Sequence, residues 1–467
     1  MTYRPVTSAV LTRLRELTAL DRVITDPAAL FDYGRDESPG PSYPPEALVK
    51  VCSAEEVAGI LALCRDERIP VTPRGLGTGL AGGSVPVQRG IMISTELMNT
   101  LIEVDTNNLT VRTEPGVTTD RVQKTCAEHG LYYPVDPASL EDCSIGGNIA
   151  TNAGGARAFK YGVTADYVRG LEAVLPDGRL IRWGGKILKN ATGYGLGRLL
   201  VGSEGTLAVI TEVVLRLVPK PKYQIDVLIP FTRLHQGIEL VLRLVHDDRL
   251  LPAVVEFVER QGIRATNQVL GSNLPFADAE VQVLVELEGN NRDQVLEDCV
   301  RLGEMAMELG AKEPLVADNP TDQTRLWTAR RKLADTLKQL YPEVTAEDIV
   351  VPLNDLPATV EEIARLQAKY GLIVVPFGHI GDGNIHVDIC REDDRPGWRE
   401  ARDRLLDELV GFVLSHGGQI SAEHGIGSEK RKWMKRALGA NELELMRRLK
   451  HAIDPDRILN PGKILPD

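Results

Sequence analysis

Several features that mark large classes of protein are missing from this chain. No stretch approaches the roughly 20 apolar residues of a membrane-spanning helix, so a membrane span is not expected. The six cysteines form no Cys-x-x-Cys pair, which argues against a disulfide framework, a zinc knuckle and an iron–sulfur cluster. A formal net charge of −12 offers no basic surface, so nucleic acid is not expected as a partner.

The remaining composition is that of an ordinary globular protein. The 467 residues suffice for two or three domains, and 43% of them are hydrophobic and 26% charged. The N-terminal stretch carries Arg13, Arg15 and Glu16 within its apolar periodicity, which predicts an amphipathic helix and not a signal peptide. Scattered thiols of this kind are typical of a reducing compartment. We therefore expect a cytoplasmic protein, with peripheral attachment to the inner membrane left open.

The least ordinary stretch is Pro73 to Gly83, PRGLGTGLAGG. Bare amides in such a glycine-rich loop form a nest for anions, most often a phosphate or pyrophosphate, and Arg74 adds a positive charge. The loop lacks the Gly-Lys-Ser/Thr of a Walker motif and does not follow the G-x-G-x-x-G pattern that opens a long helix. A nucleotide is expected here, but a Rossmann domain is not. The alternative is a surface loop punctuated by glycines, which would be favoured if this glycine-rich stretch stood alone in the sequence.

Short elements are expected around this loop. The pattern predicts strands at 47–52 and 69–72, with a helix from Ser53 to about residue 65 between them, begun by a capping box of Ser53 and Glu56. Further strands are expected at 90–94 and 109–113, and a helix at 120–129. This order is a βαβ-like opening with the glycine-rich loop after its second strand.

Two more clusters of small residues follow, at 143–155 and at 202–207, and an apolar strand is expected at 208–217. A flat ligand could lie against such backbone, with Asn148 and Asn152 able to donate and accept hydrogen bonds. Three such clusters in one region are difficult to explain by turns alone.

Taken in order, PRGLGTGLAGG, DPAS with SIGGNIATNAGG, YGVTADYVRGLEAVLPDG and GSEGTLAVIT resemble the flavin-binding domain of the vanillyl-alcohol oxidase (PCMH) type. The resemblance implies an α+β fold with a two-part FAD-binding domain whose first loop holds the pyrophosphate. Thr78 stands where covalently flavinylated relatives carry His, so the resemblance implies non-covalent FAD. The residues it assigns to FAD are Arg74, Gly75, Gly77, Thr78, Gly79, Leu80, Gly82, Gly83, Pro137, Ser139, Ser144, Gly146, Gly147, Asn148, Ala150, Thr151, Asn152, Gly155, Glu204, Gly205, Ile210 and Asn460.

The second half of the chain alternates between strand-like and helical stretches. Strands are expected at 225–229, 254–258 and 281–288, and helices at 234–246 and 292–310, which predicts a second α+β domain. The expected division is an N-terminal helical segment at 1–45, an FAD-binding domain at 46–220, a substrate- and metal-binding cap domain at 221–455, and a tail at 456–467 that returns to the FAD domain.

Histidines gather in a short region of this second half. His379 and His386 lie seven residues apart across the glycine-rich turn of IVVPFGHIGDGNIHVDI, and GGQISAEHGIG supplies Glu423 and His424, with His416 just before it. Two imidazoles and one carboxylate are a usual ligand set for a divalent metal that keeps positions open for substrate. Zinc, manganese and iron(II) all accept that set. A single histidine would more often be structural, but the cluster favours a site.

The two histidine-bearing motifs resemble the C-terminal signatures of the FAD-linked 2-hydroxyacid dehydrogenases, which include D-lactate dehydrogenase, the D subunit of glycolate oxidase and D-2-hydroxyglutarate dehydrogenase. The resemblance implies a cap domain with a mainly antiparallel sheet. It makes His379, His386 and Glu423 metal ligands, His424 the general base and Arg330 the clamp for the substrate carboxylate. Residues 460–463, NPGK, match the C-terminal motif of the family.

Oxidation of a 2-hydroxy acid requires these residue types whether or not the resemblance holds. A metal chelated by the hydroxyl and carboxylate of a 2-hydroxy acid lowers the hydroxyl pKa, a histidine takes the proton, and an arginine holds the carboxylate. Arg330 alone could instead be a solvated helix charge, because Arg331 and Lys332 follow it.

The substrate is expected to be short. Where hydroxyglutarate enzymes would carry a threonine and a lysine, this chain has Ala334 and Ala346. The absence of a second clamp favours D-lactate, then glycolate, with D-2-hydroxyglutarate as the alternative.

Two other functions are compatible with the flavin fold: that of an NADPH-using sugar-nucleotide reductase, and that of a subunit that holds FAD only to relay electrons. The His/Glu set favours a metal-dependent 2-hydroxyacid dehydrogenase over both, because neither alternative needs His379, His386 and Glu423 together. Electrons would leave through an iron–sulfur subunit, an electron-transferring flavoprotein or a quinone. The oligomeric state is open, with a homodimer as one alternative.

Overall fold

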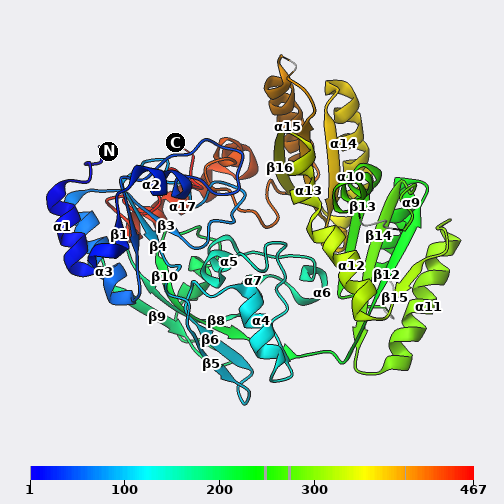
Figure 1. Cartoon of the computed structure of the whole chain (residues 1–467), viewed down its shortest axis with the longest axis horizontal. Coiled ribbons are helices and arrows are strands. Elements are labelled where there is room, and N and C mark those ends of the chain that lie inside the picture. The colour runs from blue at the N-terminus through cyan, green and yellow to red at the C-terminus, as the bar shows by residue number, and fades with distance from the viewer. Residues whose placement is uncertain (1, 247–249, 272–274, 395, 467) are drawn as a thin grey trace. The chain divides into compact units, whose positions relative to one another are not determined.

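The computed structural model describes residues 2–246, 250–271, 275–394 and 396–466 and divides into two compact units (Figure 1). Unit 1 contains Met1–Gly154, Val163–Lys220 and Glu423–Asp467, and unit 2 contains Gly155–Gly162 and Pro221–Ala422. Among the described residues, every helix is too short or too polar to cross a bilayer.

Unit 1 opens with a four-stranded sheet in the order β1-β2-β4-β3. Its strands are β1 (Val23–Ile24), β2 (Ala47–Lys50), β4 (Ile91–Ser94) and β3 (Val71–Arg74). β2 and β3 each pair in parallel with β4. The predicted strand–helix–strand order is confirmed, and the glycine-rich loop follows β3. The local sequence pattern does not predict the position of β4 between β2 and β3.

Helix α3 (Ala54–Glu67) connects β2 to β3 and buries Val57, Ile60 and Leu61 in the core of this sheet. Ser53 caps it, because its Oγ accepts from the amide of Glu56. The predicted capping box is only half formed. The Glu56 carboxylate accepts from the amide of Cys52 and pairs with both terminal nitrogens of Arg22, so it does not reach back to Ser53.

The predicted N-terminal helix is α1 (Ser8–Leu17), which buries Val10 and Leu14 against the core that α3 also covers. It is shorter than the apolar periodicity suggested, because Thr7 caps it by accepting from the amide of Val10.

A second sheet of unit 1 is antiparallel and has five strands in the order β5-β6-β10-β8-β9. The expected strands at 109–113 and 208–217 and the expected helix at 120–129 are present. β5, β8 and β9 were not predicted. The remaining elements of this part are β5 (Leu101–Asp105), β6 (Thr110–Thr113), α4 (Thr119–Ala127), β7 (Leu131–Tyr132), α5 (Ile145–Thr151), α7 (Thr164–Tyr167), β8 (Val168–Val174), β9 (Leu180–Gly184), α8 (Leu196–Leu200), β10 (Val209–Arg216), β11 (Val218–Pro219), η1 (Leu20–Arg22) and α2 (Pro27–Tyr33).

Unit 2 is built on one seven-stranded sheet in the order β15-β12-β14-β13-β17-β18-β16, and all its pairings are antiparallel. The prediction of a second α+β domain with a mainly antiparallel sheet is confirmed. Its elements are α6 (Ala158–Tyr161), β12 (Tyr223–Phe231), α9 (Leu234–His246), β13 (Val254–Glu259), α10 (Arg260–Leu270), β14 (Val281–Gly289), α11 (Arg292–Glu308), β15 (Leu315–Ala317), α12 (Pro320–Arg331), α13 (Leu333–Leu340), β16 (Glu343–Val350), η2 (Leu353–Asp355), α14 (Leu356–Tyr370), β17 (Ile373–Gly378), η3 (Ile380–Asp382), β18 (Asn384–Arg391) and α15 (Trp398–Ser415).

Strand alternation divides the residues of this sheet between two faces. On one face, Leu333 and Leu337 of α13 pack with Val375 and Phe377, and the α12 residue Trp327 packs with neighbouring strands. On the other face, α9 lies close enough that a Cβ at Gly237 would be 3.1 Å from Val281 and 3.2 Å from Val283. The first face also carries the polar side chains described below.

The last segment of the chain belongs to unit 1 and contains η4 (Arg431–Trp433), α16 (Met434–Ala437) and α17 (Ala440–Ile453). The predicted division placed residues up to 455 in the second domain. The contacts differ because the partly buried Lys450 of α17 donates to the carbonyls of Thr206 and Leu459 within unit 1. Conversely, 155–162 joins unit 2, where Arg157 pairs with both carboxylate oxygens of Glu286.

Candidate functional site

The glycine-rich loop directly follows β3 and packs closely on the next small-residue cluster. A Cβ at Gly75 would lie 2.4 Å from Oγ of Ser144, so a side chain there would displace this hydroxyl. Ser144 in turn caps α5, because its Oγ accepts from the amide of Gly147. The loop and the cluster at 143–155 are therefore in direct contact within unit 1.

The third cluster joins the same region. The amide of Glu204 donates to the carbonyl of Ala150, and a Cβ at Gly83 would lie 3.4 Å from Oε2 of Glu204. All three clusters thus line one part of unit 1, which we call the glycine cradle (residues 74–83, 144–152 and 202–206).

Several residues predicted to contact FAD are held by the protein itself. The Glu204 carboxylate accepts from the amides of Ile426 (2.8 Å) and Gly427 (2.7 Å), and burial raises its pKa. Asn148 Nδ2 donates to Thr119 Oγ1 at 2.6 Å. These side chains shape the cradle through protein contacts.

Arg74 and Asn152 are engaged in the same way. The Arg74 guanidinium donates to the Arg35 carbonyl at 2.7 Å and lies 5.4 Å from the centre of the Tyr33 ring. Burial lowers its pKa. Asn152, in a left-handed conformation with φ 57°, accepts from the amide of Ala165. The contacts of Arg74 and Asn152 with the protein therefore stabilise the backbone of the cradle.

The C-terminal motif packs on the cradle. Asn460 Nδ2 donates to the carbonyls of Gly83 (2.9 Å) and Glu204 (2.7 Å), and Lys463 Nζ donates to the carbonyl of Val85 at 2.5 Å. Burial lowers the pKa of Lys463 to about 8. Asn460 Oδ1 is buried and accepts no hydrogen bond from the protein. A bound group with a hydroxyl or amino donor would satisfy this oxygen, so the cradle fits a polar nucleotide.

The other predicted contacts are spread around the same part of the sequence. Ile210 is buried in β10, the strand that follows the third cluster, and Gly155 begins the short segment assigned to unit 2. Gly77, Thr78, Gly79, Leu80 and Gly82 lie in the first loop, Pro137 and Ser139 precede α5, Gly146, Gly147, Ala150 and Thr151 lie in α5, and Gly205 follows Glu204.

Unit 2 brings the first two predicted metal ligands together. His379 directly follows β17 and His386 lies on β18, joined by a turn in which Gly383 has a φ of +86°. A Cβ at Gly383 would be 2.2 Å from the carbonyl oxygen of Val351. The two rings lie edge to face with centroids 5.0 Å apart, and a ring nitrogen of each lies within 4.8 Å of the other. This spacing suits a shared cation.

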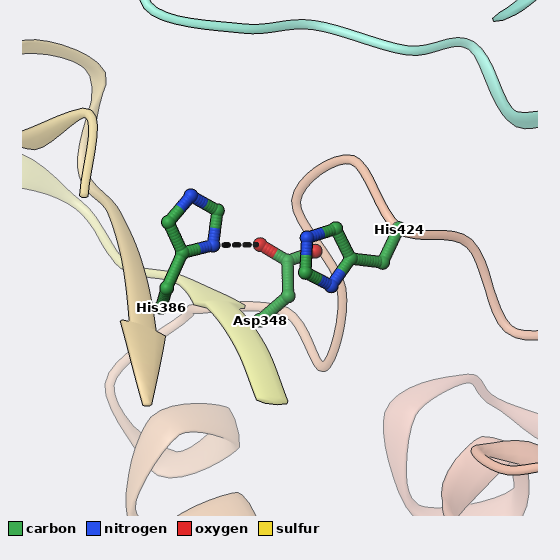
Figure 2. Close-up of side chains that lie close together, drawn as sticks. All are labelled: Asp348, His386 and His424. Atoms are coloured by element: carbon green, nitrogen blue, oxygen red, sulfur yellow. Dashed lines mark ion pairs between the residues drawn. The ribbon is translucent and has the colours of Figure 1, made fainter. Parts of the chain in front are cut away.

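Each imidazole faces a fully buried carboxylate. Nδ1 of His379 hydrogen-bonds to Glu256 of β13, and Nδ1 of His386 lies 3.6 Å from Asp348 of β16 (Figure 2). The hydrogen bond to Glu256 favours the Nδ1–H tautomer of His379, which leaves its Nε2 as the nitrogen able to bind a metal. The donor set in unit 2 therefore fits a divalent cation.

Arg330, the predicted substrate clamp, is the penultimate residue of α12 and is only 9% exposed, so its reading as a solvated helix charge is wrong. Its Nε lies 2.5 Å from Oε2 of Glu256, and its guanidinium lies 4.9 Å from the centre of the Phe377 ring. Burial alone would raise the pKa of Glu256, but Arg330 and His379 outweigh it and lower that pKa. A cavity beside this pair is lined otherwise mainly by apolar side chains of β12, β13, β14, α10, α12 and α13.

Asp348 also fixes the segment that leads to Glu423 and His424. Its Oδ2 accepts from Ser421 Oγ (3.0 Å) and from the amide of Ala422 (2.8 Å), and its Oδ1 accepts from Asn384 Nδ2 (2.7 Å). Glu423 and His424 are the next residues along the chain and belong by their contacts to unit 1. Glu423 and His424 directly follow Ala422, whose amide is hydrogen-bonded to Asp348, the carboxylate that faces His386.

Glu256 and Asp348 were not identified from the sequence. The signal available was a single acidic residue within an apolar strand, as in Val254-Val255-Glu256-Phe257-Val258. A charge at such a position is buried only when it is paired.

One of the two alanines at the expected distal clamp, Ala346, has a carboxylate neighbour. Ala346 pairs in register with Asp388, which lies two residues after His386 and so on the same face of the sheet. Asp388 is buried, and burial raises its pKa to about 7, although Lys338 and Arg330 act in the opposite direction.

Comparisons with known proteins agree with this architecture. The family described as FAD linked oxidases, C-terminal domain, matches residues 220–464, and the FAD binding domain family matches residues 45–184. The chain is 36% identical over 470 residues to a D-lactate dehydrogenase of Anaerostipes hadrus, covering 99% of this chain and 98% of that protein. It is 34% identical over 466 residues to the glycolate oxidase subunit GlcD of Bacillus subtilis, covering 98% and 97%.

Among solved structures, p-cresol methylhydroxylase with substrate bound superposes with a TM-score of 0.79 at 19% identity, covering 98% of this chain and 96% of that one. This likeness concerns the fold and confirms the expected two-part arrangement of the PCMH type.

Proposed function

Because the chain belongs to the family of FAD-linked oxidases, we propose that this FAD-dependent oxidoreductase uses a divalent metal to oxidise a short 2-hydroxy acid, D-lactate first and glycolate next. The observation that carries the proposal is the pair of buried imidazoles, each facing a buried carboxylate, beside a buried arginine. Such a set serves a chelating anion and has no purpose in a simple electron relay.

The residues divide the work as follows. His379 and His386, with Glu423, would hold the metal, which would be zinc, manganese or iron. Arg330 binds the substrate carboxylate with the guanidinium N–H groups that are not directed at Glu256. His424 takes the hydroxyl proton as general base. When bound, FAD supplies the acceptor for the hydride and the metal lowers the pKa of the hydroxyl.

The cofactor is proposed to lie in the glycine cradle, without a covalent bond. The bare amides of the first loop and the unsatisfied Oδ1 of Asn460 support this placement. Thr78, with no nucleophilic nitrogen, replaces the histidine of covalently flavinylated relatives.

The proposed preference for a short substrate rests on Ala334, Ala346 and Asp388. The alanines supply no cation for a second carboxylate, and Asp388, opposite Ala346, adds a carboxylate of the same sign. Burying like charges side by side is costly, so D-2-hydroxyglutarate is the alternative substrate and not the first choice. The electron acceptor is proposed to be an electron-transferring flavoprotein, an iron–sulfur subunit or a quinone.

The test is anaerobic flavin bleaching on purified protein. D-lactate should bleach the visible flavin absorbance with a higher kcat/KM than D-2-hydroxyglutarate, and acid precipitation should release intact FAD. Removal of the metal, verified by elemental analysis, should abolish bleaching and leave the FAD bound. Full activity without metal, or a clear preference for D-2-hydroxyglutarate, would refute the respective part of the proposal.

A further inference from the structure

Glu256 occupies a position between two predicted functional groups that lie on different elements. Its side chain is fully buried on β13. One carboxylate oxygen is hydrogen-bonded to Nδ1 of His379, and the other lies 2.5 Å from both Nε and Nη2 of Arg330. A single carboxylate therefore contacts the base of the glycine-rich turn after β17 and the C-terminal end of α12.

We infer that Glu256 is a positioning residue that couples the metal ligand His379 to the carboxylate-binding residue Arg330. The inference rests on the proposed function, because it takes His379 as a ligand and Arg330 as the clamp. It adds that the two groups are oriented by one charge and so cannot be adjusted independently.

The first consequence concerns His379. A carboxylate accepts hydrogen bonds and cannot donate, so Nδ1 of His379 must carry the proton and Nε2 must present its lone pair. The ring is also fixed in direction, because it lies 5.0 Å from the His386 ring at an interplanar angle of 86°. Glu256 thus holds the lone pair of His379 ready for a cation shared with His386.

The second consequence concerns Arg330. Pairing through Nε and Nη2 fixes the plane of the guanidinium, and the Phe377 ring, 4.9 Å from the guanidinium carbon, supports one face of it. The edge not directed at Glu256 is then held in one orientation for a planar anion such as a carboxylate.

Glu256→Gln separates these roles from simple packing. Glutamine has nearly the same shape, but its single oxygen cannot accept from both neighbours. If the oxygen faces Arg330, the amide donates toward His379 and demands the tautomer whose Nε2 is protonated. If the oxygen faces His379, the amide opposes the donors of Arg330. Either arrangement disorders one half of the site.

The experiment is a titration of metal-stripped, FAD-loaded protein with Mn²⁺ alone, in competition with a chromogenic chelator, followed by steady-state kinetics with D-lactate. Glu256→Gln should lower Mn²⁺ affinity by about 10–100-fold, the usual loss when a partner of a ligating histidine is removed. At saturating Mn²⁺ the KM for D-lactate should rise by roughly tenfold, as expected for a weakened buried carboxylate contact.

Glu286→Gln is the matched control. Glu286 is equally buried, lies on the neighbouring strand β14 and also pairs with an arginine, Arg157, but it contacts neither His379 nor Arg330. It should alter stability and leave Mn²⁺ affinity and KM within about twofold of the wild type. If both variants lost Mn²⁺ affinity and raised KM equally, Glu256 would have only a structural role and the inference would be overturned.

Two further variants keep the outcomes distinct. His386→Ala should abolish stoichiometric Mn²⁺ binding; if it and the wild type bind Mn²⁺ alike, the proposed metal site itself fails. If His386→Ala loses the metal while Glu256→Gln keeps wild-type affinity, the metal site stands and the role of Glu256 falls. Glu256→Asp, which retains the charge, covers the case in which Gln prevents folding: it should lower affinity by a smaller factor, and unchanged affinity and KM would contradict the coupling.

Discussion

Asp348→Asn should loosen the chain just before Glu423 and His424. The Asp348 carboxylate accepts from Asn384 Nδ2, from Ser421 Oγ and from the amide of Ala422. Asparagine offers only one acceptor oxygen, and its amide group would face at least one of these donors. The site is fully buried, so water does not replace the lost acceptor.

The magnitude follows from these contacts. Hydrogen bonds to a charged group contribute about 1.5–3 kcal/mol each, so the loss of one charge-assisted bond should lower the free energy of local opening by about 2 kcal/mol. That change corresponds to a roughly 30-fold larger open population of the segment at 419–422. Flavin reduction by D-lactate should slow by up to a similar factor, because the proposed base follows that segment directly.

Hydrogen exchange measured by mass spectrometry on the peptide spanning 419–424 tests this directly. The matched control is Asp226→Asn, because Asp226 is equally buried on the same sheet and binds Trp327 Nε1 at 3.1 Å, far along the sheet order from β16. Unchanged exchange at 419–424 in Asp348→Asn, or equal acceleration in the control, would refute the anchoring role.

Two further predictions concern pH and proton transfer. Burial and the nearby Glu280 raise the pKa of Glu259 from 4.5 to about 7, so its stabilising contribution is complete below pH 4.5 and is lost as the pH rises through 7. The free energy of unfolding of the wild type relative to Glu259→Gln should therefore fall by at most about 3 kcal/mol between pH 4.5 and 8.5, and chemical denaturation showing a pH-independent difference would contradict it. His424→Ala should keep metal and FAD at full occupancy while stopped-flow flavin bleaching slows by roughly 10²–10⁴-fold; a variant that has lost its metal would make His424 a ligand instead.

The sequence was most informative where local rules determine structure. The strand–helix–strand opening, the cap at Ser53 and the turn between β17 and β18 follow from periodicity, capping and glycine placement within a few residues. Motif order then gave the flavin fold, since long motifs of small residues reflect a backbone that must approach a ligand.

What the sequence did not reveal depends on pairing across the sheet. Glu256 meets His379 over 123 residues of separation and Arg330 over 74, and Asp348 meets Ala422 over 74. No local pattern encodes strand order, so an acidic residue in an apolar strand could be recognised as unusual but its partner could not be named. The same limit explains why residues 423–455 were assigned to the second domain: the contacts of Lys450 with Thr206 span 244 residues.

The face of the unit 2 sheet that carries His386 also carries five buried carboxylates in register, at Asp226, Glu256, Glu286, Asp348 and Asp388. Buried charges are costly, and apolar residues of similar volume would often stabilise a fold better. Their partners indicate what the charge achieves instead. Glu286 holds Arg157 of the inserted segment at 155–162, and Asp348 holds Ser421 and Ala422, where the chain leaves the unit. Between these two anchors, Glu256 orients His379 and Arg330. The same kind of group therefore holds the inserted segment, the segment at the end of the unit and the proposed catalytic side chains on one face of the sheet. A site with closely defined geometry requires such support.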